Sequence, residues 1–137
     1  MNEFLYPVRV YYEDTDSGGV VYYANYLKFM ERARTEWLRS LGFEQDALIR
    51  DEGVIFAVRS VTVDYHKPAV FNDQLEVMAS ITDLGKASMT FAQEVRRISD
   101  ADVQQNPLVL CSCDVRLAFL DATTLRPSAF PDESVKG

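Results

Sequence analysis

Apolar residues follow a long helical repeat in one part of this 137-residue chain. From about Tyr22 to Leu41 they recur every three or four positions, which predicts an amphipathic helix of about 18 residues, roughly 27 Å long. Gly42 stands where a left-handed C-cap belongs, and Phe43 can fold back onto the last turn. The predicted apolar stripe comprises Tyr22, Tyr26, Phe29 or Met30, Ala33, Trp37 and Leu41. Such a helix must bury its stripe, so the remaining chain has to supply a surface for it.

Apart from a short segment at 44–51, the apolar residues of the other regular segments alternate with a period of two, which indicates strands. Strands are predicted at Tyr6–Tyr12, Val54–Tyr65, Leu75–Ile81, Ala87–Val95 and Val109–Phe119, and a short second helix at Glu44–Asp51. The turns at 83–86 and 99–106 are too short for helices, which implies antiparallel pairing. We expect one α+β domain over residues 1–137, in which an antiparallel sheet of five or six strands wraps around the long helix.

The charge balance narrows the classes of ligand. The chain has 14 basic and 21 acidic residues, a net charge of −7, which counts against binding to nucleic acid. An anionic small molecule is still possible, because a few local donors can hold phosphates. The first residues hold an acid and a proline where a signal peptide needs positive charge, and no apolar run approaches the ~20 residues of a membrane span. We therefore expect a cytoplasmic protein.

Few side chains could hold a metal or act as a histidine-activated nucleophile. His66 is the only histidine, so a histidine-rich metal site cannot form and a Ser-His-Asp or Cys-His mechanism is disfavoured. His66 is expected to be an ordinary surface residue. Cys111 and Cys113 lie on the same face of a strand and are expected to be buried thiols. Chemistry in this protein is expected to use carboxylates and backbone groups.

A short acidic loop precedes the long helix. Asp14 and Asp16 stand before Gly18 and Gly19, which turn the chain toward the helix N terminus. Free N–H groups there stabilise developing negative charge, and a carboxylate beside them is what attack on a carbonyl requires. Alternatively, both carboxylates bond their own backbone or cap the helix, as is common in acidic turns. The spacing permits both interpretations.

The chain resembles a known family over essentially its whole length. The matching residues are Tyr11-Tyr12-Glu13-Asp14-Thr15-Asp16, Gly19-Val20-Val21-Tyr22, Tyr26, Glu31-Arg32-Ala33-Arg34-Thr35-Glu36, Val63-Asp64-Tyr65, Pro68-Ala69 and Leu117-Ala118-Phe119. They are similar to the hot-dog-fold thioesterases of the 4-hydroxybenzoyl-CoA thioesterase type, and most of all to the acyl-CoA thioesterases associated with the bacterial Tol–Pal system. The resemblance implies a hot-dog fold and hydrolysis of acyl-CoA to a free acid and CoA, with no metal or redox cofactor.

The resemblance also implies roles for individual residues. Asp16 would be the catalytic carboxylate, as nucleophile or general base, and the backbone N–H of Tyr23 would polarise the thioester carbonyl. Close relatives often carry histidine at the position of Tyr23, so any contribution of that side chain is missing here, whereas the backbone role suits any residue. Apart from the resemblance, the place of Asn25 near the helix start leaves two roles open: it orients a ligand or a water, or it caps the helix. The candidates for substrate binding are Gly19, Val20, Tyr22, Asn25, Tyr26 and Arg59.

Two further carboxylates are alternatives to Asp16. Asp14 could raise the pKa of Asp16 by like-charge repulsion, but a solvated or turn-bonded acid is the favoured interpretation. Other hot-dog thioesterases use a helix glutamate as the catalytic acid, and Glu31 lies within the predicted helix. Glu31 can equally pair with Arg34 or Lys28 across a turn, which we favour.

The phosphates of CoA need cations. Arg59 shares the strand parity of Val61 and Val63, which are expected to face the core. The other exposed basic candidates are Lys67, Lys86, Arg96 and Arg97. A phosphate-binding loop with the usual glycine motifs is absent from the sequence.

Two other functions and an oligomeric state also follow from the sequence. The chain could be a non-catalytic scaffold that binds acyl-CoA or acyl carrier protein near the cell envelope. A hot-dog hydratase or dehydratase acting on acyl carrier protein is disfavoured because it needs an active-site histidine. A homodimer or homotetramer is expected, because open sheet edges favour pairing. The resemblance adds that edge strands join across a two-fold axis and that active sites form at the interface.

Overall fold

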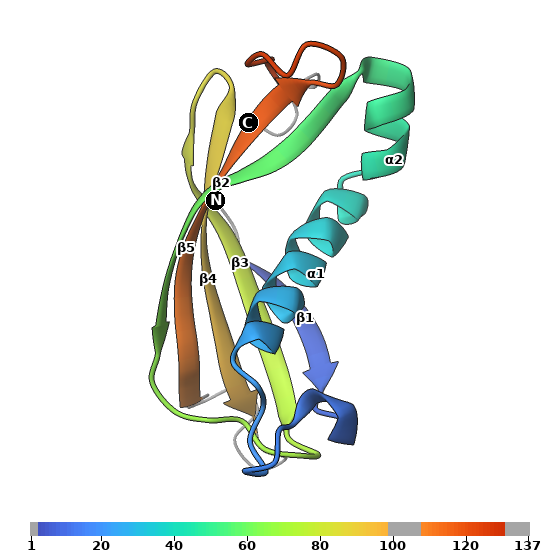
Figure 1. The fold of residues 1–137 in the computed structure, drawn as a ribbon. Coiled ribbons are helices and arrows are strands. Elements are labelled where there is room, and N and C mark those ends of the chain that lie inside the picture. The colour runs from blue at the N-terminus through green and yellow to red at the C-terminus, as the bar shows by residue number, and fades with distance from the viewer. Residues whose placement is uncertain (1–2, 99–107, 131–137) are drawn as a thin grey trace.

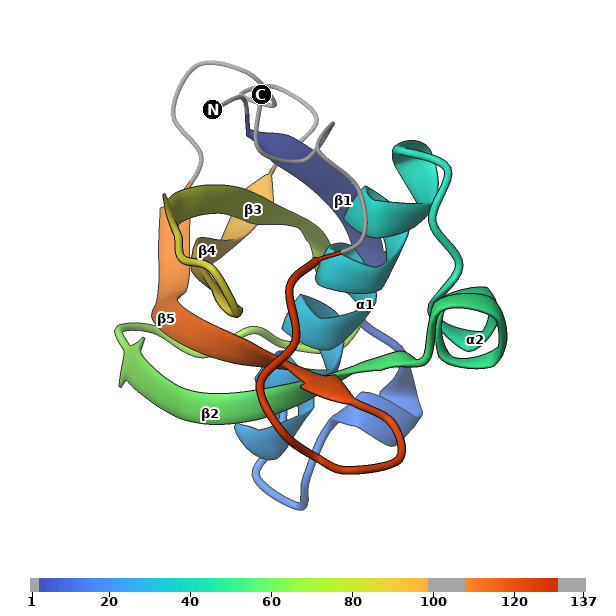
Figure 2. The same ribbon diagram turned by 90° about the horizontal axis from the view of Figure 1, so that it is seen from above.

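A long helix lies against the concave side of a curved five-stranded antiparallel sheet (Figure 1). The computed structural model describes residues 3–98 and 108–130. The main elements are β1 (Phe4–Arg9), α1 (Ala24–Ser40), β2 (Val54–Tyr65), β3 (Gln74–Leu84), β4 (Ser88–Ile98) and β5 (Leu108–Asp121). Figure 2, seen from above, shows the strands curving around α1. The α+β prediction is confirmed; the predicted turn at 99–106 lies outside the described residues.

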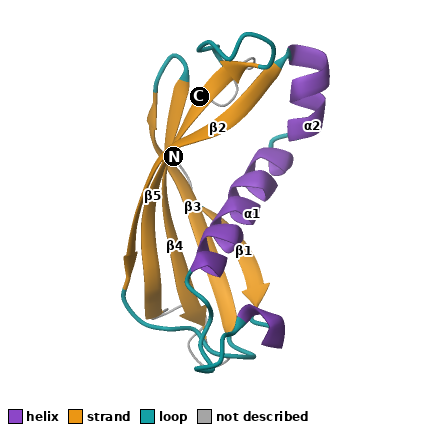
Figure 3. Cartoon of the chain, in the orientation of Figure 1, coloured by secondary structure: helices purple, strands orange, loops and turns teal. Residues whose placement is uncertain are grey.

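The strand order is β1-β3-β4-β5-β2, and all pairs are antiparallel. β3, β4 and β5 are neighbours in the sheet in the order of the chain, as the sequence predicts. β2 and β3 are consecutive in the chain but are not neighbours, because residues 66–73 cross from one edge of the sheet toward the other (Figure 3). β1 and β2 are therefore the two edges of the sheet.

α1 is slightly shorter than its sequence pattern predicts. It has 17 residues, and its buried face comprises Tyr26, Phe29, Met30, Ala33, Arg34 and Leu38. Tyr22 and Leu41, the predicted ends of the stripe, lie outside the helix and are exposed. α1 packs mainly against β1, β3 and β4. The concave side of β2 is left open, with Val58, Val61 and Tyr65 each more than two-fifths exposed.

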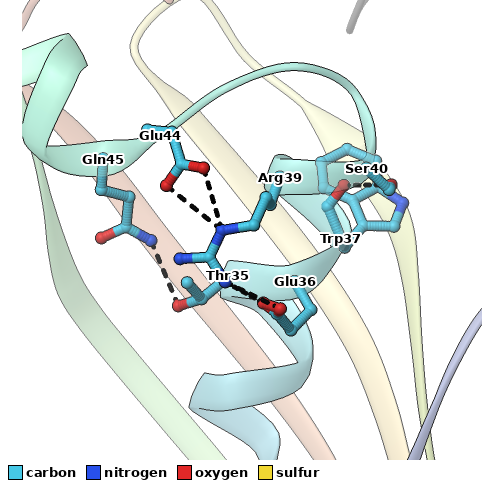
Figure 4. A network of polar contacts seen from close by, with 7 residues as sticks. All are labelled: Thr35, Glu36, Trp37, Arg39, Ser40, Glu44 and Gln45. Carbon is cyan, nitrogen blue, oxygen red and sulfur yellow. Dashed lines mark hydrogen bonds and ion pairs between the residues drawn. The ribbon is translucent and has the colours of Figure 1, made fainter.

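The C terminus of α1 ends as its sequence predicts. Gly42 has a φ of 93°, in the left-handed region. Its N–H bonds the Arg39 carbonyl at 2.9 Å, and the Phe43 N–H bonds the Leu38 carbonyl at 3.0 Å, which together form a Schellman motif. Figure 4 shows the Arg39 guanidinium between the carboxylates of Glu36 and Glu44. A cation in the last helical turn also complements the helix dipole.

Two smaller elements differ from prediction to different degrees. The second helix is present as α2 (Gln45–Ala47), which continues into a wider helical turn at Leu48–Glu52.

β1 ends at Arg9 rather than at Tyr12, although the alternation continues in the sequence. Arg9 pairs with Gln74, the first residue of β3, so the partner strand ends there. The chain then turns into a short 3₁₀ helix at Tyr12–Asp14.

The contact between α1 and the sheet contains two buried polar side chains, Arg34 and Gln93. The Arg34 guanidinium donates to the Gln93 side-chain oxygen at 2.8 Å, and the Gln93 amide donates to the Met30 carbonyl at 3.1 Å. Burial lowers the pKa of Arg34. Because a buried cation without an acceptor is costly, Gln93 stabilises the position of α1 on β4.

Replacing Gln93 with leucine should therefore destabilise the protein although leucine suits the core. Arg34 loses an acceptor, and a hydrogen bond to a charged group contributes about 1.5–3 kcal/mol. We expect Gln93→Leu to lower the free energy of unfolding by about that amount in urea denaturation. Gln74→Leu, on the half-buried start of β3, is the control and should change stability little. Equal stabilities of Gln93→Leu and wild type would contradict this role.

The two cysteines are buried in the core and are free thiols, as predicted. Burial raises the pKa of Cys111 to about 12 and that of Cys113 to about 11. Since the thiolate is the reactive form, neither residue has nucleophilic character near neutral pH.

Iodoacetamide should accordingly leave both cysteines unmodified in the folded protein at pH 8 and label both in guanidinium chloride, as mass spectrometry can measure. Stability should also fall as pH rises above about 8.5, because unfolded thiols ionise there while the folded ones stay protonated. Rapid labelling of the native protein would show that the thiols are accessible and ionisable, contrary to this expectation.

Candidate active site

The acidic loop between β1 and α1 is fixed to the crossover segment 66–73 at one end of the molecule (Figure 1). The Val21 N–H donates to the Ala69 carbonyl at 2.8 Å, and Val20 forms a bridge with Val70. The Ala69 N–H donates to the hydroxyl of Tyr26, on α1, at 2.9 Å. Ala69 and Tyr26 are both buried. The loop and the helix start are thus held to the same short segment.

Asp16 forms a turn with its own loop. Its side-chain Oδ1 accepts the Gly18 N–H at 2.8 Å, and its carbonyl accepts the Gly19 N–H at 3.0 Å. Gly19 has a φ of 82°, a conformation that favours glycine. The self-bonded interpretation of this loop is therefore correct in part. Asp16 is nevertheless exposed, and its second oxygen, Oδ2, accepts no hydrogen bond from the residues that the structure describes.

Asp14 has a structural position in the same loop. Its carboxylate accepts the Tyr11 N–H at 2.8 Å, which confirms the expectation of a turn-bonded acid. Its carbonyl accepts the Tyr22 N–H at 3.1 Å and the Asn25 side-chain amide at 3.0 Å. The Asn25 side chain thus links the helix start to the loop, a contact that the sequence did not predict.

Free backbone donors lie at the N terminus of α1. Tyr23 is the N-cap residue of the helix. Neither the Tyr23 N–H nor the Ala24 N–H donates to another residue in the described part of the chain, whereas Asn25 and Tyr26 donate to the Tyr22 and Tyr23 carbonyls. Unpaired donors and the helix dipole together make this end attractive to negative charge.

An open pocket of about 310 Å³ has Tyr23 in its lining. It is lined by Val20, Val21, Tyr23, Tyr26, Tyr65, His66, Lys67 and Pro68. Three of the site residues predicted from the sequence, Val20, Tyr23 and Tyr26, are among these lining residues. Gly19 and Tyr22 lie beside the pocket in the chain but not in its lining; Tyr22 stacks on Tyr23, with ring centroids 5.1 Å apart. Asp16 also lies outside the lining, four residues before Val20.

Residues 65–68 also line this pocket, which was not predicted from the sequence. The Tyr65 hydroxyl donates to the Tyr23 carbonyl at 3.2 Å, and its ring contacts those of Tyr23 and Tyr26. His66 is exposed as expected, but it lines the pocket and contacts the Ser112 hydroxyl at 3.0 Å. The signal available was an aromatic residue, a histidine and a lysine together at a strand end before a proline.

The parity argument for Arg59 is wrong. A β-bulge lies between Val58 and Ser60, so Val58 and Val61 both pair opposite buried residues of β5 while Arg59 has no partner there. One extra residue reverses the alternation at that point. Arg59 is exposed and lies outside the pocket lining.

The other basic residues considered for binding the CoA phosphates differ in whether they pair with a carboxylate or line the pocket. Arg96 pairs with Glu94 at 2.9 Å, and Arg97 pairs with Asp73 at 2.9 Å. Lys86 lies in the turn between β3 and β4. Lys67 is the member of this group that lines the pocket.

The alternative acid Glu31 lies farther along α1. It is exposed, and it forms no ion pair with Arg34 or Lys28, so the expected pairing is wrong. Together with Arg34 and Thr35 it lines a separate cavity of about 120 Å³. Within residues 3–98 and 108–130, no cluster of histidine, cysteine, aspartate and glutamate could hold a metal ion, and no helix is long and apolar enough to cross a membrane.

Comparison with known proteins identifies the family. Residues 18–104 match the model of the thioesterase superfamily. The acyl-CoA thioesterase YbgC of Haemophilus influenzae is 42% identical over 132 residues, which cover 96% of this chain and 91% of that protein. A probable thioesterase from Bartonella henselae is 30% identical, with a TM-score of 0.83 over 95% of this chain and all of that one. A 4-hydroxybenzoyl-CoA thioesterase, 17% identical, has the same fold, with a TM-score of 0.86 over 98% of this chain and 96% of that one.

Sequence and fold agree in this assignment, and the chain belongs to the thioesterase superfamily, with its hot-dog fold.

Proposed function

We propose that this protein is an acyl-CoA thioester hydrolase, which converts an acyl-CoA and water into a carboxylic acid and CoA. The observation that carries the proposal is the free Tyr23 N–H at the start of α1, beside an open pocket and an exposed carboxylate loop. The Haemophilus influenzae relative, an acyl-CoA thioesterase, supports the same substrate class. The proposed catalytic unit is a single hot-dog domain spanning residues 1–137.

The proposed chemistry uses the backbone donors and one carboxylate. The thioester carbonyl oxygen accepts hydrogen bonds from the Tyr23 N–H and the Ala24 N–H. Because these backbone donors are already in place, they stabilise the charge that develops on the oxygen without movement of a side chain. Asp16 attacks the carbonyl carbon itself, or removes a proton from an attacking water. The carbon–sulfur bond then breaks and CoA leaves as a thiolate, which takes up a proton. If Asp16 is the nucleophile, water afterwards hydrolyses the acyl–Asp16 anhydride, which releases the carboxylic acid and restores the carboxylate; if Asp16 is the general base, the water adds directly and the acid is released in one step. Either role requires an ionised carboxylate with an available oxygen, and Oδ2 of Asp16 fits this requirement.

Binding of CoA is assigned to the open side of the pocket. Arg96 and Arg97 already pair with carboxylates, so the exposed Lys67 is the better candidate for a phosphate contact. The pocket also contains three tyrosine rings, which suit the apolar part of a thioester. An acyl carrier protein as an alternative carrier, and a cytoplasmic location, stay predictions of the sequence.

We further propose that the chain forms at least a homodimer through β2. This edge strand is 12 residues long and exposes Val58 and Val61 on its concave side. Exposed apolar edge strands favour pairing with another chain.

Analytical ultracentrifugation at micromolar concentration should give at least twice the mass of the chain. Val61→Lys should weaken the association, because it places a charge on the proposed interface. Thr82→Lys, on an exposed position of β3, is the control and should keep the wild-type mass. A stable wild-type monomer would refute the dimer.

Asp16→Asn tests the catalytic assignment. Asparagine keeps an oxygen that can accept the Gly18 N–H, so the turn and the melting temperature should survive. The charge and the ability to take a proton are lost, so hydrolysis of acyl-CoA should fall by about 10²–10⁴-fold. Steady-state thiol release over acyl-CoAs of several chain lengths measures this loss.

Two matched variants complete the experiment. Asp14→Asn changes the same charge in the same loop and should lower turnover less than tenfold, because Asp14 bonds the backbone. Glu31→Gln should have little effect. Wild-type turnover in Asp16→Asn together with loss of turnover in Glu31→Gln would assign catalysis to the helix acid instead. Binding of acyl-CoA by the wild type without any thiol release would favour the scaffold function.

A further inference from the structure

We propose that Tyr65 is a positioning residue for this hydrolysis, holding the first turn of α1 so that its free N–H groups stay directed toward the thioester carbonyl oxygen. The inference rests on the proposed function and adds to it a residue from a distant part of the chain.

Tyr65 reaches the helix start from the last residue of β2. Its hydroxyl donates to the Tyr23 carbonyl at 3.2 Å, a contact between residues 42 positions apart. Its ring lies edge-on to those of Tyr23 and Tyr26, with centroids 5.6 Å apart in each pair. Tyr23, Tyr26 and Tyr65 all line the pocket. Tyr65 therefore contacts both the helix start and the space for substrate.

The start of α1 needs such support. Tyr23 makes no side-chain capping bond, and the first turn contains no acidic residue to complement the helix dipole. The Tyr23 carbonyl accepts the Tyr26 N–H at 3.2 Å. A carbonyl has two lone pairs, so the Tyr65 hydroxyl can add a second bond to the same oxygen. This bond stabilises the first turn from outside the helix.

The same contact strengthens a donor. The Tyr23 carbonyl and the Ala24 N–H belong to one peptide group, and a hydrogen bond accepted by the carbonyl polarises its N–H. Partial burial raises the pKa of Tyr65, so its hydroxyl keeps the donated proton at neutral pH. Stronger donors act most on the transition state, in which the oxygen carries more charge than in the bound substrate. The expected effect is therefore on kcat rather than on KM.

Tyr65→Phe removes the hydroxyl and keeps the ring. We expect kcat for acyl-CoA hydrolysis to fall about two- to tenfold, the range for one lost hydrogen bond, with KM within about twofold of wild type. Tyr65→Leu removes the ring as well and should also raise KM. Tyr11→Phe is the matched control, because Tyr11 is 62% exposed and its hydroxyl bonds no described residue; both constants should stay unchanged.

Two measurements distinguish positioning from substrate contact. An S-alkyl-CoA thioether lacks the carbonyl, so Tyr65→Phe should bind it with wild-type affinity in calorimetry. In the ligand-free protein, the amide proton of Ala24 should move upfield in the NMR spectrum of Tyr65→Phe but not in that of Tyr11→Phe.

An unchanged kcat, an unmoved Ala24 amide, or weaker thioether binding in Tyr65→Phe would each overturn the role of Tyr65. A wild-type protein that releases no thiol from any acyl-CoA would instead overturn the proposed function, and the Ala24 shift would still report on the contact itself.

Discussion

Burial of one face of α1 against the concave side of the sheet is the constraint on which the rest of this structure depends. The helix places Phe29, Met30 and Ala33 on that face with no more than 1% of their surface exposed. A flat sheet could not enclose a helix in this way, so the strands curve around it (Figure 2). Because the contact excludes water, the polar pair Arg34 and Gln93 within it has to be mutually bonded.

The backbone of Ala69 links the buried helix to the loop of the candidate active site. Its carbonyl holds the acidic loop through the Val21 N–H, and its N–H bonds the Tyr26 hydroxyl on α1. Asp14 adds a second link, because its carbonyl accepts bonds from Tyr22 and Asn25. The free N–H of Tyr23 thus lies beside an ordered loop. The proposed hydrolysis needs backbone donors that are already in place to stabilise its transition state, and these bonds support that proposal.

β2 carries both the surface proposed for dimer formation and part of the pocket. As an edge strand it offers unpaired backbone groups and the exposed side chains of Val58 and Val61. Its last residue, Tyr65, lines the pocket and bonds the helix start. Since α1 packs mainly on β1, β3 and β4, the side of the helix toward β2 is the open one, and the pocket lies there. A partner chain bound at β2 would therefore lie close to the proposed substrate.

The sequence by itself determined the local features of this protein. The helical period predicted α1, Gly42 predicted its C-cap, and the alternation around Cys111 and Cys113 predicted a buried strand face. The acidic loop before the helix was identified as the candidate site. These features depend on side-chain periodicity and on the conformation of single residues. Both are set by residues that are close together in the sequence.

Only the tertiary structure decided which distant segments meet. β1 ends at Arg9 because its partner strand ends, and the bulge beside Arg59 reverses an alternation that the sequence shows as continuous. Pairing of β2 with β5 rather than with β3 brings Tyr65 and Lys67 to the start of α1. The physical reason is that backbone hydrogen bonds are alike for nearly all residues, so the choice of partner depends on how the whole core closes rather than on any local pattern.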